Sequence, residues 1–134
     1  MDQRVKQLWV DALRSGKYQQ GRDALKINDG RGERYCCLGV LCDLYAKEYP
    51  KSEFKPEVQI TGDYGMPGAL GFYATDGDSV EGFNSGIPPE LVCKWANLPS
   101  PNPSVDSVNG DCLTELNDSC MSFATIADII EKQF

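Results

Sequence analysis

The stretch YCCLGVLCDLY, residues 35–45, limits most strongly how this chain can fold. Read as a helix that begins at Cys37, it is apolar nearly all round, and such a helix belongs in the centre of a core. Gly39 costs a helix about 1 kcal/mol relative to alanine, and its expected compensation is the close approach of another element. The helix should end before Pro50. One apolar face holds Val40, Leu41, Leu44 and Tyr45, and another holds Leu38 and Cys42.

Amphipathic helices are predicted at both ends of the chain. Over residues 3–14 the apolar residues follow the spacing of one helical face, and Gly16 is placed to stop the helix. At the other end, SFATIADIIEKQF shows a second apolar face, with Ser122 or Ser119 as the N-cap. The residues of this last helix that should face inward are Phe123, Ile126, Ala127 and Ile130.

The predicted strands are short and antiparallel. DALKI (23–27) and ERYCC (33–37) flank NDGRG, whose residues tolerate the positive φ angles of a tight connection, so a β-hairpin is expected here. Residues 51–87, rich in Gly and Asp, are predicted to be a loop-rich insertion of short strands joined by long loops, with EVQIT as one strand. Loops of this kind often carry recognition.

Short elements complete the chain. IPPELVCKWANL predicts a short helix led by prolines, and CLTELND predicts one turn of helix or a strand. Together these patterns predict one α+β domain over residues 1–134, with a central buried helix, amphipathic helices at both ends and short antiparallel hairpins.

Charge is unevenly distributed. The formal net charge is −7, but residues 1–55 hold 11 of the 13 basic residues and have a net charge of +3. Residues 56–134 have a net charge of −10. Because phosphate contacts need clustered Lys and Arg, direct nucleic-acid binding is not expected. The first part could attract an anionic ligand and the second a basic partner; solvated surface charge without any partner is the alternative.

The N-terminus is charged from its second residue and lacks the apolar stretch of a signal peptide. The longest apolar run, residues 36–42, has seven residues against the roughly 20 that cross a bilayer. We therefore expect a soluble protein of the cytoplasm, or the product of something that replicates in a cytoplasm, with no membrane partner.

Histidine is absent from the sequence, and this excludes Cys-His and Ser-His nucleophile pairs and the usual zinc enzymes. The cysteines show no CxxC spacing, so structural zinc is a minor alternative, as are disulfides in a chain without an export signal. We expect free thiols that fill the core. A reactive Cys36, near a helix N-terminus and close to Arg34, is the other alternative. The six cysteines are Cys36, Cys37, Cys42, Cys93, Cys112 and Cys120.

Paired carboxylates are the acid-base chemistry that remains without histidine. The candidates are Asp43, Asp111, Glu115 and Asp118. Their spacing selects no pair and no magnesium site, and neither GxxxxGK nor GxGxxG occurs. The sequence therefore assigns no catalytic residue, no metal ligand and no cofactor.

The segment RSGKYQQGRDALK (14–26) places cationic side chains beside an aromatic residue and two glycines. A loop of this composition can offer charge-assisted hydrogen bonds to a phosphate and a ring for stacking, although connections between elements often have the same composition. LND (116–118), just before the last helix, could add a polar side chain to the pocket or cap that helix. The predicted ligand-binding residues are Lys17, Tyr18, Gln20, Arg22, Arg34 and Asn117.

Four segments occur in a recognisable order: LWVDALRSGKYQQG, YCCLGVLCDLY, PPELVCKWANL and LTELNDSCMSFATIADIIE. In these motifs the chain resembles a family of small proteins encoded by tailed bacteriophages and prophages. The resemblance covers about two-thirds of the chain and leaves 51–87 unmatched. It carries no catalytic residues over. It implies a phage origin and, by analogy with other small phage proteins, interference with host machinery or host defence.

Three functions remain open. The first is a non-enzymatic binding protein that sequesters a small anionic, nucleotide-derived host signal or blocks a host defence protein. The second is an acidic inhibitor whose carboxylates between residues 76 and 118 imitate nucleic-acid phosphates. The third is a small carboxylate- or metal-dependent enzyme. Aromatic residues of the middle segment could form a homo-oligomer contact or complete the core; they are Tyr64, Phe72, Tyr73 and Phe83.

Overall fold

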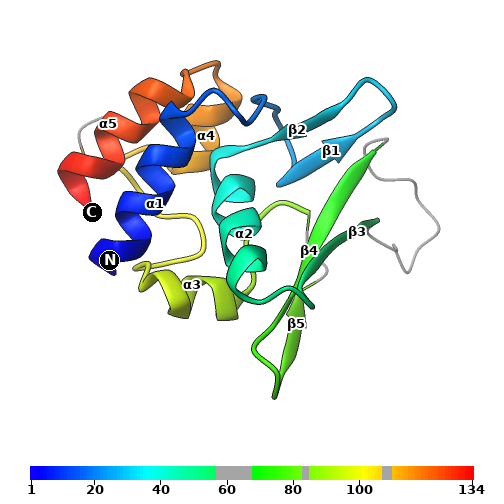
Figure 1. Ribbon diagram of the computed structural model, residues 1–134. Coiled ribbons are helices and arrows are strands. Elements are labelled where there is room, and N and C mark those ends of the chain that lie inside the picture. The colour runs from blue at the N-terminus through cyan, green and yellow to red at the C-terminus, as the bar shows by residue number, and fades with distance from the viewer. Residues whose placement is uncertain (57–67, 83–84, 107–109) are drawn as a thin grey trace.

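The computed structural model describes residues 1–56, 68–82, 85–106 and 110–134 (Figure 1). In this part of the chain, helices and a five-stranded antiparallel sheet form the α+β fold that the sequence predicts. The helices are α1 (Gln3–Arg14), α2 (Cys37–Glu48), α3 (Glu90–Ala96), α4 (Leu113–Asp118) and α5 (Phe123–Gln133). The strands are β1 (Lys26–Asn28), β2 (Glu33–Tyr35), β3 (Glu53–Pro56), β4 (Ala69–Thr75) and β5 (Val80–Gly82).

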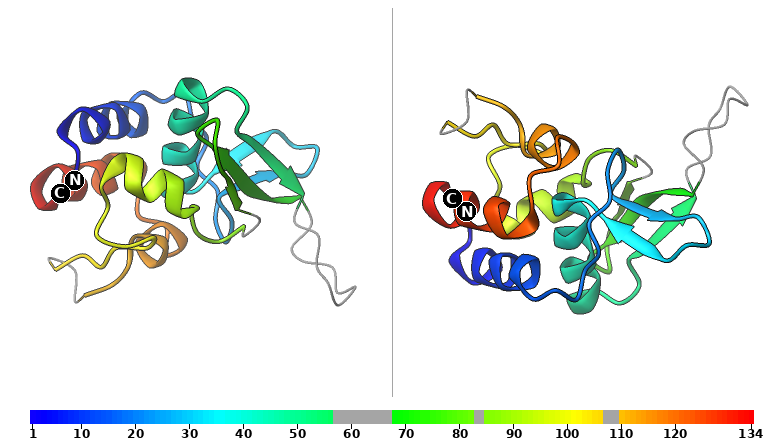
Figure 2. Two further views of the ribbon diagram at one scale, coloured as in Figure 1. Left: turned by 90° about the horizontal axis from the view of Figure 1, so that it is seen from below. Right: turned by 90° about the horizontal axis from the view of Figure 1, so that it is seen from above.

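Helix α2 lies between the sheet and the other helices, as Figures 1 and 2 show. This position confirms the predicted central buried helix and explains why both of its faces are apolar. The Trp9 side chain of α1 is fully buried, and its Nε1 donates to the Cys37 carbonyl oxygen at 2.8 Å. The buried residues of α2 are Cys37, Leu38, Gly39, Val40, Leu41, Cys42, Leu44 and Tyr45.

Gly39 is the point where α2 meets the chain just before β1. A Cβ built on Gly39 would lie 1.7 Å from the carbonyl oxygen of Leu25. The close approach expected from a glycine inside a helix is therefore confirmed, and backbone is the neighbour that makes it. Leu25 is also held by its own backbone bonds: its N–H donates to the Ser85 oxygen at 2.6 Å, and its oxygen accepts from the Cys36 N–H at 3.1 Å.

Helices α1 and α5 lie side by side and bring the two termini together (Figure 2). Their bounds agree with the predicted helices. Asp2 caps α1, and Ser122, one of the two predicted candidates, caps α5 by accepting from the Thr125 N–H at 3.2 Å. The predicted inward residues of α5, Phe123, Ile126, Ala127 and Ile130, are all buried.

The sheet has the order β2-β1-β4-β3, and β5 pairs with β4. Strands β1 and β2 form the predicted hairpin around NDGRG, with Lys26 opposite Tyr35 and Asn28 opposite Glu33. Strand β4 is longer than the short elements expected in the loop-rich insertion: it has seven residues and contacts β1, β3 and β5. The predicted strand EVQIT lies outside the described residues.

Phe72 explains why β4 forms despite its glycine-rich sequence. Its ring is fully buried and lies edge-on to Tyr45 of α2, with 6.3 Å between the ring centroids. Burial against α2 thus overrides the weak local preference for a strand. Of the aromatic residues considered for a contact between copies, Phe72 completes the core and Tyr73 is half-buried with Lys55 over its ring. Tyr64 and Phe83 lie outside the described residues.

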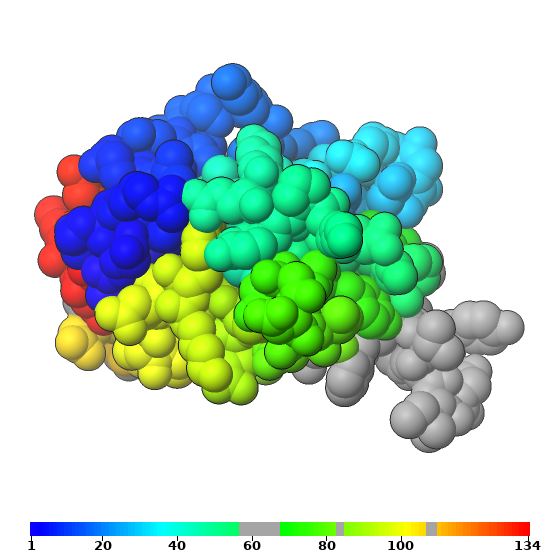
Figure 3. Space-filling view, turned by 60° about the horizontal axis from the view of Figure 1, so that its bottom comes forward, coloured from blue at the N-terminus to red at the C-terminus, as the bar shows by residue number. Residues whose placement is uncertain are grey.

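Glu48, at the end of α2, links three helices on the molecular surface. Its carboxylate accepts from Arg4 of α1 at 2.5 Å and from Nε1 of Trp95 of α3 at 2.6 Å. Figure 3 shows the end of α2 (teal) between α1 (blue), α3 (yellow) and the β4–β5 hairpin (green). The Arg4 hydrogen bond, followed by the Trp95 bond, holds the pKa of Glu48 below its usual value.

We expect Glu48→Gln to lower the free energy of unfolding by about 0.5 kcal/mol at pH 7, the usual size for a partly exposed ion pair. Because the folded pKa is depressed, this contribution is present above the unfolded pKa of 4.5 and is lost as the pH falls through the folded value. Urea unfolding at pH 7 and pH 3 measures it. The two proteins should differ at pH 7, and the difference should be smaller at pH 3; equal stability at pH 7 would contradict the assignment. Glu53→Gln, at an exposed surface pair, is the control.

Candidate functional site

The loop that follows α1 lies directly against β2. Tyr35 donates its N–H to the Gln19 oxygen at 2.9 Å and accepts from the Gly21 N–H at 2.8 Å. A Cβ on Gly21 would lie 2.8 Å from the Cβ of Arg34, so a glycine permits this contact. The QQG segment therefore borders the sheet on the outer side of β2, in a parallel bridge between Gln20 and Tyr35.

Asn117 of α4 fixes this loop from behind. Its side chain is buried, with an exposed fraction of 1%. Nδ2 donates to the Gly21 oxygen at 2.8 Å, while Oδ1 accepts from Nε2 of Gln20 at 3.0 Å and from the Cys37 N–H at 3.2 Å. One amide thus joins α4, the loop and the first turn of α2, and we call this group of hydrogen bonds the Asn117 clamp.

Asp118, the next residue, holds the far end of the loop. Its Oδ1 accepts from the Asp23 N–H at 3.1 Å. Asp23 has a φ of 67°, a left-handed conformation that aspartate adopts more readily than most residues. The alternative in which LND caps the last helix is wrong, because Ser122 caps α5 while Asn117 and Asp118 bind the loop.

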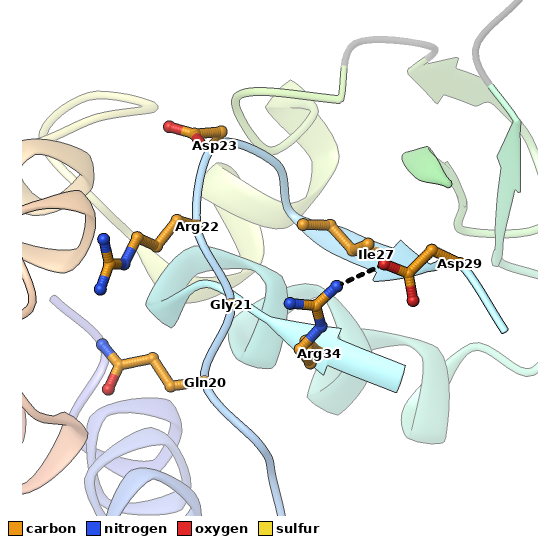
Figure 4. A pocket seen from close by; sticks show the side chains of 7 residues that line it. All are labelled: Gln20, Gly21, Arg22, Asp23, Ile27, Asp29 and Arg34. Carbon is orange, nitrogen blue, oxygen red and sulfur yellow. Dashed lines mark hydrogen bonds and ion pairs between the residues drawn. The ribbon is translucent and has the colours of Figure 1, made fainter. Parts of the chain in front are cut away.

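A pocket of about 580 Å³ opens between this loop and the β1–β2 hairpin. Figure 4 shows Gln20 and Arg22 extending away from the loop on one side, and the Arg34–Asp29 pair on the other. The residues that line the pocket are Gln20, Gly21, Arg22, Asp23, Ile27, Asp29 and Arg34.

The two arginines of the pocket differ in their contacts. Nη2 of Arg34 lies 2.7 Å from Oδ2 of Asp29, and its Nε is buried without a hydrogen-bond partner among the described residues. Arg22 is exposed, and within the described part of the chain its guanidinium forms no hydrogen bond or ion pair. The pocket thus holds one arginine with unused donors and one whose donors face solvent.

The six predicted ligand-binding residues divide into three groups. Gln20, Arg22 and Arg34 line the pocket. Asn117 lies behind it and has its polar atoms engaged in the clamp. Lys17 is exposed and Tyr18 is half-buried, and neither lines the pocket.

Tyr18 takes part in packing. Its hydroxyl donates to Oδ2 of Asp43 at 2.5 Å, and its ring lies edge-on to Tyr35 with 5.0 Å between centroids. Burial, with the Asp43 bond, raises the pKa of Tyr18 well above its usual value, so the phenol keeps its proton at neutral pH. The ring that was expected to stack on a ligand supports the hairpin.

Sequence reasoning missed Asp23 and Asp29, the two carboxylates of the pocket. Asp29 belongs to the NDGRG connection, where its residue type was explained by the turn alone. The Asp29 carboxylate also accepts from the Arg31 N–H at 3.1 Å. Asp23 directly follows Arg22, a predicted ligand-binding residue, and this proximity was the signal from which Asp23 could have been predicted.

The cysteines are all free, and Cys36, Cys37, Cys42 and Cys93 are buried. Cys36 caps α2: its sulfur accepts from the Gly39 N–H at 3.3 Å. Burial raises the pKa of Cys36 to about 11, opposite to the direction that a reactive thiolate requires. These four thiols thus fill the core, as expected, whereas the expectation is wrong for Cys112, which is half-buried, and for Cys120, which is exposed.

Three of the four carboxylates considered for acid-base work have local partners. Asp43 accepts from Tyr18, Glu115 accepts from the Cys112 N–H at 3.2 Å, and Asp118 accepts from Asp23. Among the residues that the structure describes, no group of three or more Cys, Asp or Glu residues is arranged to hold a metal ion.

Comparisons with known proteins identify the family. Searches of curated proteins and of solved structures found no match. No helix in the described ranges has the length and apolarity that crossing a bilayer would demand. The match to a family spans residues 1–134, and the chain therefore belongs to the family described as domain of unknown function DUF8296.

Proposed function

We propose that this protein reversibly binds a small nucleotide-derived anion in the pocket between the 20–23 loop and the β1–β2 hairpin. The observation that carries the proposal is that Arg22 and Arg34 line one pocket, from opposite sides of the loop in Figure 4, and that the Arg22 guanidinium forms no hydrogen bond or ion pair among the described residues. Arginine donors bind phosphate oxygens through charge-assisted hydrogen bonds. Binding of this kind needs no histidine and no nucleophile.

The carboxylates narrow the ligand class. Asp29 already partly neutralises Arg34, and Asp23 adds a second negative charge, so a bare phosphate is a poor fit. A nucleotide offers phosphate oxygens to the arginines and ribose hydroxyls or base amino groups to the carboxylates. The volume of about 580 Å³ lies in the range of small-molecule sites.

The Asn117 clamp supports binding by fixing the loop in advance. Gly21 is held both by Asn117 and by Tyr35, and the Asp23 N–H is held by Asp118. A loop that is already ordered loses less conformational entropy when a ligand binds. We attribute the position of LND in the fold to this preorganisation.

Arg22→Ala tests the proposal directly. Loss of its charge-assisted bonds should weaken nucleotide binding by about tenfold or more, since such bonds contribute about 1.5–3 kcal/mol. Titration calorimetry and thermal shift against mono-, di- and cyclic nucleotides at low ionic strength measure this effect.

Arg31→Ala is the matched control, because it removes the same charge from the neighbouring hairpin turn, outside the pocket lining. It should leave binding within about twofold, the residual expected from long-range charge alone. Equal losses of affinity in the two variants would show that the nucleotide does not bind in this pocket. If no nucleotide in the panel binds, the proposed function is wrong.

We propose further that the chain comes from a tailed phage or prophage and that sequestration counters a host signal. The support is the order of motifs set out above, together with a pocket suited to holding a ligand. Stoichiometric capture of a host nucleotide, one per chain, is the expected behaviour; a product that accumulates beyond one equivalent would favour the enzyme alternative.

Among the residues that the structure describes, no contact specifically favours the acidic inhibitor. Several of its carboxylates have local partners: Asp76 accepts from the N–H groups of Asp78 and Ser79, and Glu81 accepts from that of Leu91. Such carboxylates stabilise turns and helix ends.

A further inference from the structure

A second pocket adjoins the first. It has a volume of about 370 Å³ and shares Asp23 with the nucleotide pocket. We infer that this second pocket receives the base of the nucleotide, while the arginine pocket receives the phosphate and Asp23 contacts the ribose between them. The inference rests on the proposed function and adds the class of ligand: a nucleotide with an intact base and ribose.

The walls of the second pocket are suited to a planar ring. Ala24 and Cys36 are buried and provide an apolar floor, and Ile87 forms an apolar side. Ile87 is one of the exposed large hydrophobic residues of the described chain, with an exposed fraction of 38%. A bound ring would remove this side chain from water, which favours binding in proportion to the apolar area covered.

Polar groups at the edge of the second pocket can recognise a base. Nδ2 of Asn102 donates to Oγ1 of Thr114 at 2.8 Å, and Oδ1 of Asn102 accepts from the Thr114 N–H at 3.2 Å. These bonds fix both side chains and leave the second Nδ2 proton and the Thr114 hydroxyl proton as donors. Asp118 adds a carboxylate oxygen, Oδ2, beside the Oδ1 that holds Asp23.

Asp23 is placed to bridge the two pockets. Its backbone N–H is fixed by Asp118, and its left-handed conformation sets the direction of its side chain. Figure 4 shows Asp23 at the end of the loop opposite Gln20, with Arg22 between them. In the described part of the chain its carboxylate forms no hydrogen bond or ion pair, so both oxygens can accept from ribose hydroxyls.

The test compares the four ribonucleoside 5′-monophosphates with ribose 5-phosphate, which lacks the base, by titration calorimetry. At least one monophosphate should bind tenfold or more tightly than ribose 5-phosphate. Ile87→Trp, which fills the second pocket, should abolish this advantage and leave the affinity for ribose 5-phosphate unchanged. Val80→Trp, at an exposed position on β5, is the control and should leave both affinities unchanged.

Asp23→Asn provides an independent readout, because asparagine tolerates the same backbone conformation. The wild-type protein should prefer the ribonucleotide over its 2′-deoxy form, and the variant, which keeps one acceptor oxygen but loses the charge, should show a smaller preference. An unchanged preference would contradict the contact between Asp23 and the ribose.

The outcomes separate the two proposals. If the monophosphates bind no more tightly than ribose 5-phosphate, or if Ile87→Trp keeps their advantage, the base pocket is wrong while Arg22-dependent binding still supports the proposed function. If no probe binds, or if Arg22→Ala has no effect, the proposed function fails and the base pocket fails with it.

Discussion

Gly39→Ala is expected to destabilise the protein by about 3 kcal/mol, the upper end of the usual cost of overpacking a core. The added methyl group would lie 1.7 Å from the carbonyl oxygen and 2.6 Å from the carbonyl carbon of Leu25. If the atoms of Leu25 near the methyl group belonged to its side chain, they could rotate away, but they belong to the backbone and cannot. Either α2 or the chain before β1 has to move, and α2 is packed on both sides.

The sign of this effect separates tertiary contact from helix propensity. In a helix that contacts no other part of the protein, replacing glycine by alanine would stabilise the helix by about 1 kcal/mol. Urea unfolding gives the difference, and Ala46→Gly, at a half-buried position of the same helix, shows for comparison the combined effect of helix propensity and of one lost methyl group. If Gly39→Ala raises the free energy of unfolding, the close packing of α2 against Leu25 is wrong.

Asn117→Ala is expected to cost about 3 kcal/mol, because several buried groups lose their partner together. The Gly21 oxygen, the Cys37 N–H and Nε2 of Gln20 all bond to this one side chain. Water reaches the site poorly, since Asn117 is only 1% exposed. The variant should also increase amide hydrogen exchange at Gly21, where the clamp holds the loop.

A double-mutant cycle with Gln20→Ala isolates one bond of the clamp. The two side chains should couple by about 0.5–1.5 kcal/mol, so that the double variant loses less stability than the sum of the single variants. Asn28→Ala, at an exposed position on β1, is the control and should change stability by no more than about 0.5 kcal/mol. A cost this small for Asn117→Ala would show that the clamp does not hold the loop.

The helices could be predicted from the sequence because their periodicity is local. The pattern over 3–14 predicted the bounds of α1, the apolar run predicted that α2 begins at Cys37 and ends before Pro50, and Gly39 alone indicated a close contact. The sequence predicted short strands within 51–87 but not the place or the length of β4, because its glycines resemble those of a loop and its stability comes from the burial of Phe72 under α2.

The site was partly predictable, because some of its residues belong to one local segment while others are brought together only by the fold. Composition pointed to Gln20, Arg22 and Arg34, since cations beside glycines are visible locally. The role of Asn117 was not visible: its bond to Gln20 joins residues 97 positions apart, and the sequence holds no signal of that contact. Tyr18 was predicted to bind a ligand because a tyrosine ring can stack on a ligand as readily as it can pack against another ring, here that of Tyr35.

The central claim is that the pocket beside the clamped loop holds a nucleotide without transforming it. A nitrogen-15 NMR titration with the ribonucleoside monophosphates, followed in parallel by phosphorus-31 NMR, tests this claim in one sample. Saturable shifts are predicted at the amides of Gly21, Arg22 and Asp23 and at the Nε–H groups of Arg22 and Arg34, with the phosphorus signal of the nucleotide recovered unchanged after denaturation. Shifts confined to other parts of the protein, or a new phosphorus signal that grows past one equivalent per chain, would contradict it.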